Sequence, residues 1–224
     1  VVRGDPSFPE VAVVIPARWA STRFPGKVLA PLGGRPLVLR VCDVAARAST
    51  VVQVVVATDA EPVVAAVRGA GYDAVLTNPD HPSGTDRVAE VAARGEARIV
   101  LGLQADEPFL DPRDLDALVD HLANPAHEEP LATLAVPLAG RDLWLDPNTV
   151  KVVTARDGRA LYFSRSPLPY ARPASGPLMF PPAGAPPEFA LQHVGAYGWR
   201  RDALLAFTRL PVSPLERSEG LEQL

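Results

Sequence analysis

The chain of 224 residues has little of several residue types, and each shortage excludes a class of protein. It contains one cysteine, Cys42, so no disulfide framework holds it together, and we expect a reducing, cytoplasmic setting. No apolar run reaches the length of a membrane span, and the first residues lack a signal-peptide pattern, so we expect no membrane partner. The formal net charge of -4 disfavours a general nucleic-acid-binding protein, which would carry a basic footprint.

Lysine is also scarce, because only two of the 22 basic residues are lysines, Lys27 and Lys151. A Gly-x-Gly-x-x-Gly pattern is missing after the first apolar run, which disfavours a dinucleotide-dependent dehydrogenase. The chain has enough hydrophobic residues for a core, since 47% of the residues are hydrophobic and 21% are charged. This length and composition fit one globular domain, or one domain with a small lobe.

The first half of the chain alternates between strand-like and helical patterns. Short β-branched runs indicate buried strands, and apolar residues at helical spacing indicate amphipathic helices. Expected strands cover residues 11–15, 51–57, 73–76 and 98–103. Expected helices cover 36–48, 61–68, 84–94 and 112–122, the third capped by Ser83 or Thr85 and the fourth by Asp111. This alternation predicts an α/β fold with a mostly parallel sheet flanked by helices.

The second half predicts a smaller mixed α+β lobe. Strand-like runs cover 131–136, 149–154, 160–163 and 192–199, and an Asp-Gly turn at 157–158 joins two of them in a hairpin. Helical patterns cover 201–207 and 214–224, and we expect the last helix to return to the core. The proline-rich stretch 167–187 predicts a long arm without regular structure. We therefore divide the chain at residues 1–125 and 126–224, within one structural domain.

The most informative segment is the loop at residues 16–27, which follows the first expected strand. It carries Arg18, Arg23 and Lys27, with Ser21 between them, among proline and glycine residues. Several cations and free backbone N–H groups in one loop suit a polyanion, and a nucleoside triphosphate is the plainest candidate. The loop is not a Walker motif, because the Gly-Lys-Ser/Thr ending is missing. A solvated basic loop is the alternative, but open α/β sheets bind ligands at the carboxyl ends of their strands, where this loop lies.

A second polar group follows the strand expected at 98–103 and consists of Gln104, Asp106 and Glu107. Parallel topology brings it to the same sheet edge as the cationic loop. A carboxylate there can hold Mg²⁺ against triphosphate oxygens, because Mg²⁺ prefers one or two carboxylates plus phosphates and water. We assign the metal to Asp106, the reading of a base or sugar edge to Gln104, and the capping of the following turn to Glu107.

Two further groups are weaker signals. Ser83 begins the helix expected at 84–94, where helix capping and ligand contact are compatible. In the lobe, Arg165 can clamp a carboxylate with two parallel hydrogen bonds. His193 and Tyr197 are four apart in an expected strand and so point to one face, although a structural histidine is an equal alternative. The tryptophans are interpreted as packing residues: Trp19, Trp144 and Trp199.

Together these segments resemble one family, the 3-deoxy-manno-octulosonate cytidylyltransferases. The matching segments occur in the family's order, at 15–27, 83–90, 103–108, 150–152, 160–167, 193–197, 213–216 and 219–224. The Ser-Arg-Ser-Pro segment at 164–167 and the His-x-Gly-x-Tyr segment at 193–197 are more specific than the first loop, which other nucleotidyltransferases share loosely. The resemblance implies a Rossmann-like nucleotide-diphospho-sugar transferase fold, with a nucleotide-binding half at 1–125. Residues 126–224 would then form a sugar-binding and dimerisation lobe with a returning helix.

The resemblance also implies a reaction, in which CMP is transferred from CTP to 3-deoxy-D-manno-octulosonate (Kdo) and pyrophosphate is released. This is a step toward lipopolysaccharide, carried out by a cytoplasmic homodimer with Mg²⁺. The implied CTP-binding residues are Arg18, Ser21, Arg23, Lys27, Ser83 and Gln104. The implied catalytic residues are Arg18, Lys27 and Asp106, the last of which also binds the metal. The implied sugar-acid contacts are Arg165, His193, Tyr197, Glu222 and Gln223.

Three features depart from the family's pattern. Ala105 stands where the family usually has glycine, and Asp86 stands where it usually has glutamate. The family's second metal-binding aspartate comes from a segment after the final helix that is not among these 224 residues, and we expect the protein to continue beyond Leu224. The alternatives are a cytidylyltransferase for sialic acid, 8-amino Kdo or a polyol phosphate, and a non-catalytic nucleotide-binding protein.

Overall fold

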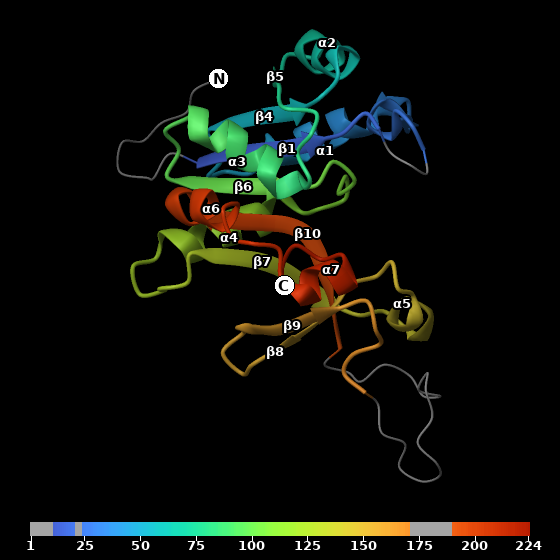
Figure 1. Cartoon of the computed structure of the whole chain (residues 1–224). Helices are drawn as coiled ribbons and strands as arrows, with labels where there is room; N and C mark the ends of the chain where they lie inside the picture. The colour runs from blue at the N-terminus through green and yellow to red at the C-terminus, as the bar shows by residue number, and fades with distance from the viewer. Residues whose placement is uncertain (1–10, 21–23, 171–189) are drawn as a thin grey trace. The chain divides into compact units, whose positions relative to one another are not determined.

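A computed structural model of the chain describes residues 11–20, 24–170 and 190–224 (Figure 1). These residues fall into two compact units, which we describe separately. Unit 1 contains the residues up to Thr133 together with Gly195–Leu210, and unit 2 contains Leu134–Val194 and Pro211–Leu224. The division expected near residue 125 lies close to the first of these boundaries. The chain nevertheless rejoins unit 1 at Gly195, because the second half of strand β10 pairs with a strand of that unit.

Unit 1 is built on a mostly parallel sheet. Its strands are β1 (Val11–Ala17), β4 (Gln53–Thr58), β5 (Asp73–Leu76), β6 (Ile99–Leu103) and residues 196–200 of β10 (Leu191–Arg200). Their order is β5–β4–β1–β6–β10, and all pairings are parallel except that β10 is antiparallel to β6. Helices cover both faces of a parallel sheet, so both faces of each strand are buried. This is why the sequences of these strands are continuous apolar runs. A short hairpin of β2 (Pro31–Leu32) and β3 (Arg35–Pro36) lies outside this sheet.

Helices connect the strands of unit 1 and cover its sheet (Figure 1). They are α1 (Leu37–Ala45), α2 (Glu61–Gly69), α3 (Gly84–Arg94), α4 (Pro112–Ala123) and α6 (Arg201–Phe207), with a single 3₁₀ turn, η1 (Lys27–Leu29). Two expected helix caps are confirmed. Ser83 Oγ accepts a hydrogen bond from the Asp86 N–H at the start of α3, and the Asp111 carboxylate accepts one from the Arg113 N–H at the start of α4.

One part of the core of unit 1 joins the sheet to α3 and α6. Its buried members are Val14, Ala57, Val88, Ala89, Ala92, Val100, Trp199 and Leu204. Burial of a valine or leucine side chain stabilises a fold by about 1.5–3 kcal/mol. On β10, Gly198 allows α4 to approach closely, because a Cβ there would lie 2.7 Å from Leu122 Cδ1. The prediction that Trp199 is a packing residue is confirmed.

Unit 2 contains the hairpin of β8 (Lys151–Thr154) and β9 (Ala160–Ser164), with β10 residues 191–192 paired to β8. The hairpin turns at Gly158, whose φ of 88° favours glycine, as the Asp-Gly pair predicts. Strand β7 (Leu131–Pro137) pairs with β10. The described part of the lobe also contains two short helices, α5 (Arg141–Leu145) and α7 (Pro214–Glu219). Trp144 of α5 is fully buried against Leu138 and Ala190, so its predicted packing role is confirmed.

The end of the chain differs from the expectation. A helix was expected over 214–224, but α7 ends at Glu219, because Gly220 adopts a left-handed conformation (φ 63°) that terminates it. Glu222 and Gln223 therefore lie in a turn after the helix. The helix that rejoins unit 1 is α6 rather than this last one. Most of the expected proline-rich arm, residues 171–187, lies outside the described residues. None of the described helices combines the length and apolar character needed to span a bilayer.

Candidate functional site

The cationic loop and the acidic segment meet at one edge of the unit 1 sheet. β1 and β6 are parallel neighbours, so the residues that follow them lie at the same edge. A hollow of about 210 Å³ opens there, lined by Pro16, Arg18, Lys27, Val28, Leu37, Gly84, Gln104, Ala105 and Asp106. The structure thus brings together four described residues of the predicted nucleotide site, Arg18, Lys27, Gln104 and Asp106. Ser83, predicted for the same site, is not among the residues that line the hollow, although its neighbour Gly84 is. Ser21 and Arg23, predicted for the same site, lie outside the described residues.

Lys27 and Asp106 form an ion pair across this hollow. Lys27 Nζ lies 2.9 Å from Asp106 Oδ2, and the two side chains are 43% and 57% exposed. An exposed pair of this kind contributes only about 0–1 kcal/mol to stability. Either charge can therefore exchange its partner for a ligand at little cost.

The backbone before Lys27 folds back on itself. The Gly26 N–H donates to Trp19 O at 3.1 Å, and Gly26 has a φ of 70°, which favours glycine. Trp19 is 40% exposed and its ring lies beside Gly26. The predicted packing role of Trp19 is therefore limited to a glycine of its own loop and does not extend to the buried core.

Arg18 and Ser83 both contact the segment before α3. Arg18 Nη2 donates to Pro82 O at 2.7 Å, which holds the guanidinium at the rim of the hollow. Ser83 Oγ donates to Asp86 Oδ2 at 2.6 Å in addition to accepting from the Asp86 N–H at 3.0 Å. Asp86 thus completes the cap of α3, and a contact between Ser83 and a ligand stays a prediction.

The backbone of Gly195 in β10 forms hydrogen bonds with both Gln104 and Glu107. The Gln104 N–H donates to Gly195 O at 3.0 Å, and the Gly195 N–H donates to Glu107 Oε1 at 3.0 Å. A Cβ on Gly195 would lie 2.9 Å from Gln104 Cγ, so only glycine fits there. Burial raises the pKa of Glu107, and the neighbouring Asp106 charge adds to this effect. The expectation that Glu107 caps the following turn is wrong, because its carboxylate binds a strand 88 residues away.

Asp106 can bind a hard cation such as Mg²⁺ only if substrate phosphates and water supply the remaining ligands. The described residues contain no group of three or more histidine, cysteine or carboxylate side chains arranged around a metal position. One exposed carboxylate, completed by phosphate oxygens and water, is nevertheless a donor set that suits Mg²⁺. The ammonium of Lys27 on Asp106 Oδ2 shows that this carboxylate already attracts a cation.

Arg165, one of the predicted sugar-acid residues, binds the backbone of unit 2. The Arg165 guanidinium donates to three main-chain carbonyls, through Nε to Glu219 O (2.7 Å), Nη1 to Pro147 O (2.9 Å) and Nη2 to Gly220 O (3.2 Å). The geometry therefore gives Arg165 a structural task in holding these backbone segments together. Its contact with a sugar acid stays a prediction.

Two further charged residues of the lobe, Glu219 and Lys151, form several hydrogen bonds each. The Glu219 carboxylate accepts from Tyr162 Oη (3.2 Å), Ser164 Oγ (2.6 Å) and the Arg165 N–H (2.9 Å). Burial opposes its ionisation, but these hydrogen bonds outweigh that effect and hold the pKa of Glu219 below its usual value.

Lys151 is fully buried, and its Nζ donates to three carbonyl oxygens, those of Asp146 (2.9 Å), Thr149 (2.5 Å) and Arg165 (2.6 Å). Burial lowers the pKa of Lys151. The described lobe thus uses its lysine to hold backbone together rather than to bind an anion.

The remaining predicted sugar-acid residues lie in both units. His193 packs edge-on against Phe163 with ring centroids 5.3 Å apart, and Gln223 Nε2 lies 3.5 Å from His193 Nδ1. Burial lowers the pKa of His193 to about 4, so its ring is neutral at physiological pH. Glu222 is partly buried next to Gln223, whereas Tyr197 belongs to unit 1 and packs against its core.

One residue near the nucleotide loop was missed by the sequence reasoning. Asp59 follows β4 at the same sheet edge, and its Oδ1 accepts from the Trp19 N–H at 2.9 Å. Its position directly after a buried strand was a signal, but an aspartate before a helix is usually interpreted as a cap.

Known proteins match almost the whole chain. Residues 12–224 match the family model of the cytidylyltransferases. A 3-deoxy-manno-octulosonate cytidylyltransferase of Geobacter sulfurreducens is 46% identical over 215 residues, which cover 96% of this chain and 85% of that protein. Its counterpart in Syntrophotalea carbinolica is 45% identical over 216 residues, which cover 96% of this chain and 84% of that protein.

Solved structures are similar as well. A CMP:2-keto-3-deoxy-manno-octonic acid synthetase complexed with CTP superposes with a TM-score of 0.83 at 41% identity, covering 96% of this chain and 83% of that one. A 4-diphosphocytidyl-2C-methyl-D-erythritol synthase of Anaerococcus prevotii has a TM-score of 0.54 at 10% identity, covering 89% and 73%. At that identity the second likeness concerns the fold alone.

Proposed function

The chain belongs to the family of 3-deoxy-manno-octulosonate cytidylyltransferases, and on this premise we propose that the hollow between Arg18, Lys27 and Asp106 is the place where CMP is transferred from CTP to Kdo. The family and the nucleotide-diphospho-sugar transferase fold predicted from the sequence are thereby confirmed. The assignment of single residues to steps of the reaction is our proposal. Its main support is the Lys27–Asp106 ion pair, an exposed cation and carboxylate facing each other at the strand ends.

The triphosphate of CTP binds to the cationic side of the hollow. Arg18 and Lys27 each carry a positive charge at its rim, and both are exposed enough to exchange their present partners. Both charges oppose the negative charge that develops on the leaving pyrophosphate, and fixed cations at such a position stabilise a transition state. Gln104, whose amide lies beside Gly84, offers a donor and an acceptor to the base or the ribose.

The reaction is an in-line displacement at phosphorus without a protein nucleophile. The anomeric hydroxyl oxygen of Kdo forms a bond to the α-phosphorus of CTP, and the bond between that phosphorus and the bridging oxygen breaks. Pyrophosphate leaves with the electron pair, and the hydroxyl proton passes to solvent. Holding both substrates in one geometry supplies much of the acceleration.

Asp106 is the residue that would hold Mg²⁺ in this site. When bound, Mg²⁺ neutralises phosphate charge and lowers the pKa of a coordinated hydroxyl. A metal on Asp106 would take the place of the Lys27 ammonium and would leave Lys27 to bind the phosphates, an exchange that the exposure of both side chains permits.

Contacts to the sugar acid come from His193, Tyr197, Glu222 and Gln223 in this proposal. A neutral His193 offers one ring donor and one acceptor to sugar hydroxyls rather than a charge to the carboxylate. Arg165 acts behind them, because its bonds to the carbonyls of 219 and 220 fix the turn that carries Glu222 and Gln223. A homodimeric state and a cytoplasmic location are further proposals that rest on family membership.

A pyrophosphate-release assay tests the proposed function. It crosses CTP, UTP, ATP and GTP with Kdo, 8-amino Kdo and sialic acid, at saturating Mg²⁺. We expect release with CTP and Kdo well above every other combination. Preference for another sugar acid would reassign the substrate within the cytidylyltransferases. Binding of CTP without release in any combination would indicate a non-catalytic nucleotide-binding protein.

A further inference from the structure

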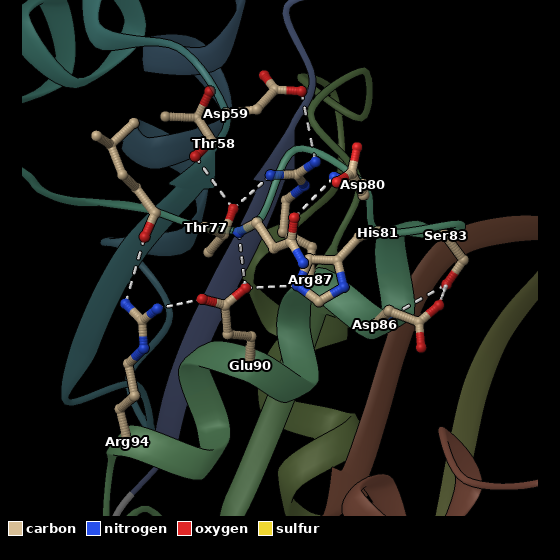
Figure 2. Close-up of polar contacts among 12 residues, drawn as sticks. Thr58, Asp59, Thr77, Asp80, His81, Ser83, Asp86, Arg87, Glu90 and Arg94 are labelled. Atoms are coloured by element: carbon tan, nitrogen blue, oxygen red, sulfur yellow. Dashed lines mark hydrogen bonds and ion pairs between the residues drawn. The ribbon is translucent and has the colours of Figure 1, made fainter.

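A buried arginine lies behind the cationic loop and takes no part in the reaction described above. Arg87 of α3 has a fully buried side chain, and it donates through Nη1 to Thr77 Oγ1 (Figure 2). Its Nη2 lies 3.5 Å from Asp59 Oδ2, and among the described residues its Nε has no partner. A guanidinium buried with an unmet donor is costly, so a protein keeps it only where surrounding contacts compensate.

Asp59 connects this arginine to the cationic loop. One carboxylate oxygen, Oδ2, faces Arg87, and the other, Oδ1, accepts from the Trp19 N–H at 2.9 Å. The Trp19 carbonyl in turn accepts from the Gly26 N–H at 3.1 Å. The backbone at Trp19 is therefore held on both sides, between Arg18 and the turn that presents Lys27.

A second set of contacts holds the segment against which Arg18 rests. Glu90 of α3 accepts from the Asn78 N–H (3.0 Å) and lies 2.5 Å from His81 Nε2, and it pairs with Arg94 (Figure 2). The segment so fixed ends at Pro82, whose carbonyl accepts from Arg18. Arg18 thus lies between two backbone segments that are held by side chains. Asp59 holds the segment at Trp19, and Glu90 holds the segment that ends at Pro82.

The charges explain why a carboxylate is needed at position 59. Burial lowers the pKa of Arg87, the Asp59 charge opposes this effect, and the nearby Arg18 charge adds to it. Two guanidinium groups therefore repel each other across this region, and two carboxylates oppose the effect on Arg87, Asp59 more strongly than Glu90. A neutral residue at 59 would remove the larger of these two balancing charges.

We propose that Asp59 is a positioning residue of the nucleotide site, which joins buried Arg87 to the Trp19 backbone and so holds Arg18 and Lys27 in the geometry that binds the triphosphate. The proposal rests on the proposed function for its ligand, CTP. Asp59 itself touches no substrate.

Calorimetric titration with CTP and steady-state kinetics test this role in Asp59→Ala and Asp59→Asn. Asp116→Ala is the matched control, because Asp116 also accepts backbone N–H bonds in unit 1, from Ser49 (3.1 Å) and Thr50 (2.9 Å), away from the hollow. We expect Asp59→Ala to weaken CTP binding by about tenfold or more and to raise the KM for CTP more than it lowers kcat. Asp59→Asn keeps an oxygen acceptor for the Trp19 N–H and is expected to lose less.

The control separates positioning from stability. Asp116→Ala is expected to lower the melting temperature while its CTP affinity stays within about twofold of the wild type. CTP affinity unchanged in both Asp59 variants would overturn the proposal, as would an equal loss of affinity in Asp116→Ala. If Asp59→Ala does not fold, Asp59→Asn decides alone. Wild-type protein that binds CTP without releasing pyrophosphate with Kdo would contradict the proposed function but leave this test valid.

Discussion

The two lysines of this chain have the same chemistry and opposite surroundings. Lys27 of unit 1 is 43% exposed and faces one carboxylate, Asp106, at the edge of a hollow. Lys151 of unit 2 is fully buried, and its ammonium donates to three main-chain carbonyls. The first can exchange its partner for a phosphate, and the second cannot leave without exposing three acceptors.

The same contrast holds for the arginines that lie in the recognised motifs. Among the described residues Arg18 donates to one carbonyl and lines the hollow, whereas Arg165 donates to three carbonyls and ties backbone segments together. A residue type in a motif therefore does not reveal whether its charge is free to meet a ligand. Arg18 and Lys27 of unit 1 present their charges at the strand ends, whereas Arg165 and Lys151 of unit 2 hold backbone segments together.

The largest effect is expected for the acidic side of the hollow. Asp106→Asn removes the carboxylate that would hold Mg²⁺, and we expect kcat to fall by about 10²–10³-fold with a smaller change in the KM for CTP. The measurement is pyrophosphate release at saturating Mg²⁺. Asp120→Asn, an exposed carboxylate on α4, is the control and should keep full activity. Near-normal turnover in Asp106→Asn would remove Asp106 from the mechanism.

The structural lysine is expected to affect stability instead. Lys151→Met leaves the carbonyls of Asp146, Thr149 and Arg165 without their donor, and we expect the free energy of unfolding to fall by about 2 kcal/mol. Urea unfolding of the variant, compared with Arg159→Met in the exposed hairpin turn, measures this difference. An unchanged midpoint for Lys151→Met would mean that its three bonds do not hold the lobe.

A smaller, selective effect is expected for Arg165. Arg165→Ala frees the carbonyls of Glu219 and Gly220 and loosens the turn that follows, so the KM for Kdo should rise by about five- to tenfold. The KM for CTP should change by less than about twofold, because the nucleotide residues belong to unit 1. Equal increases of both constants would contradict the role that we assign to Arg165.

The smallest effect concerns pH. The pKa of His193 lies at about 4 in the folded protein against an ordinary 6.5, so the unfolded chain binds a proton more readily between these values. Its contribution to stability is complete above about pH 6.5 and is lost as the pH falls toward about 4. Urea unfolding at several pH values should therefore show a shallower acid decline in His193→Gln than in the wild type. Parallel declines would show that His193 does not titrate in this way.

Local patterns predicted much of the fold. The helices at 84–94 and 201–207 and the strand at 73–76 were predicted to the residue, because apolar spacing and caps such as Ser83 act within a few positions. The last helix was predicted too long. Its apolar spacing continues past Gly220, yet that glycine adopts the left-handed conformation that ends α7 at Glu219.

The contacts of the site likewise fall into those that the sequence predicts and those that it does not. The meeting of Lys27 and Asp106 was predictable, because parallel topology places the ends of neighbouring strands at one edge. The bond from Asp59 to the Trp19 N–H joins residues 40 apart, and that from Glu107 to the Gly195 N–H joins residues 88 apart. The position of Asp59 after a strand was a signal, but the sequence does not show which distant backbone N–H a carboxylate binds, nor which carbonyls a guanidinium binds.

Turnover by Lys27→Met tests most directly whether the exposed lysine, rather than the buried one, serves the chemistry. With saturating CTP, Kdo and Mg²⁺, we expect pyrophosphate release about 10²-fold slower than in the wild type. The melting temperature should stay within about 2 °C, because an exposed ion pair contributes little to stability. Release at the wild-type rate would contradict the account.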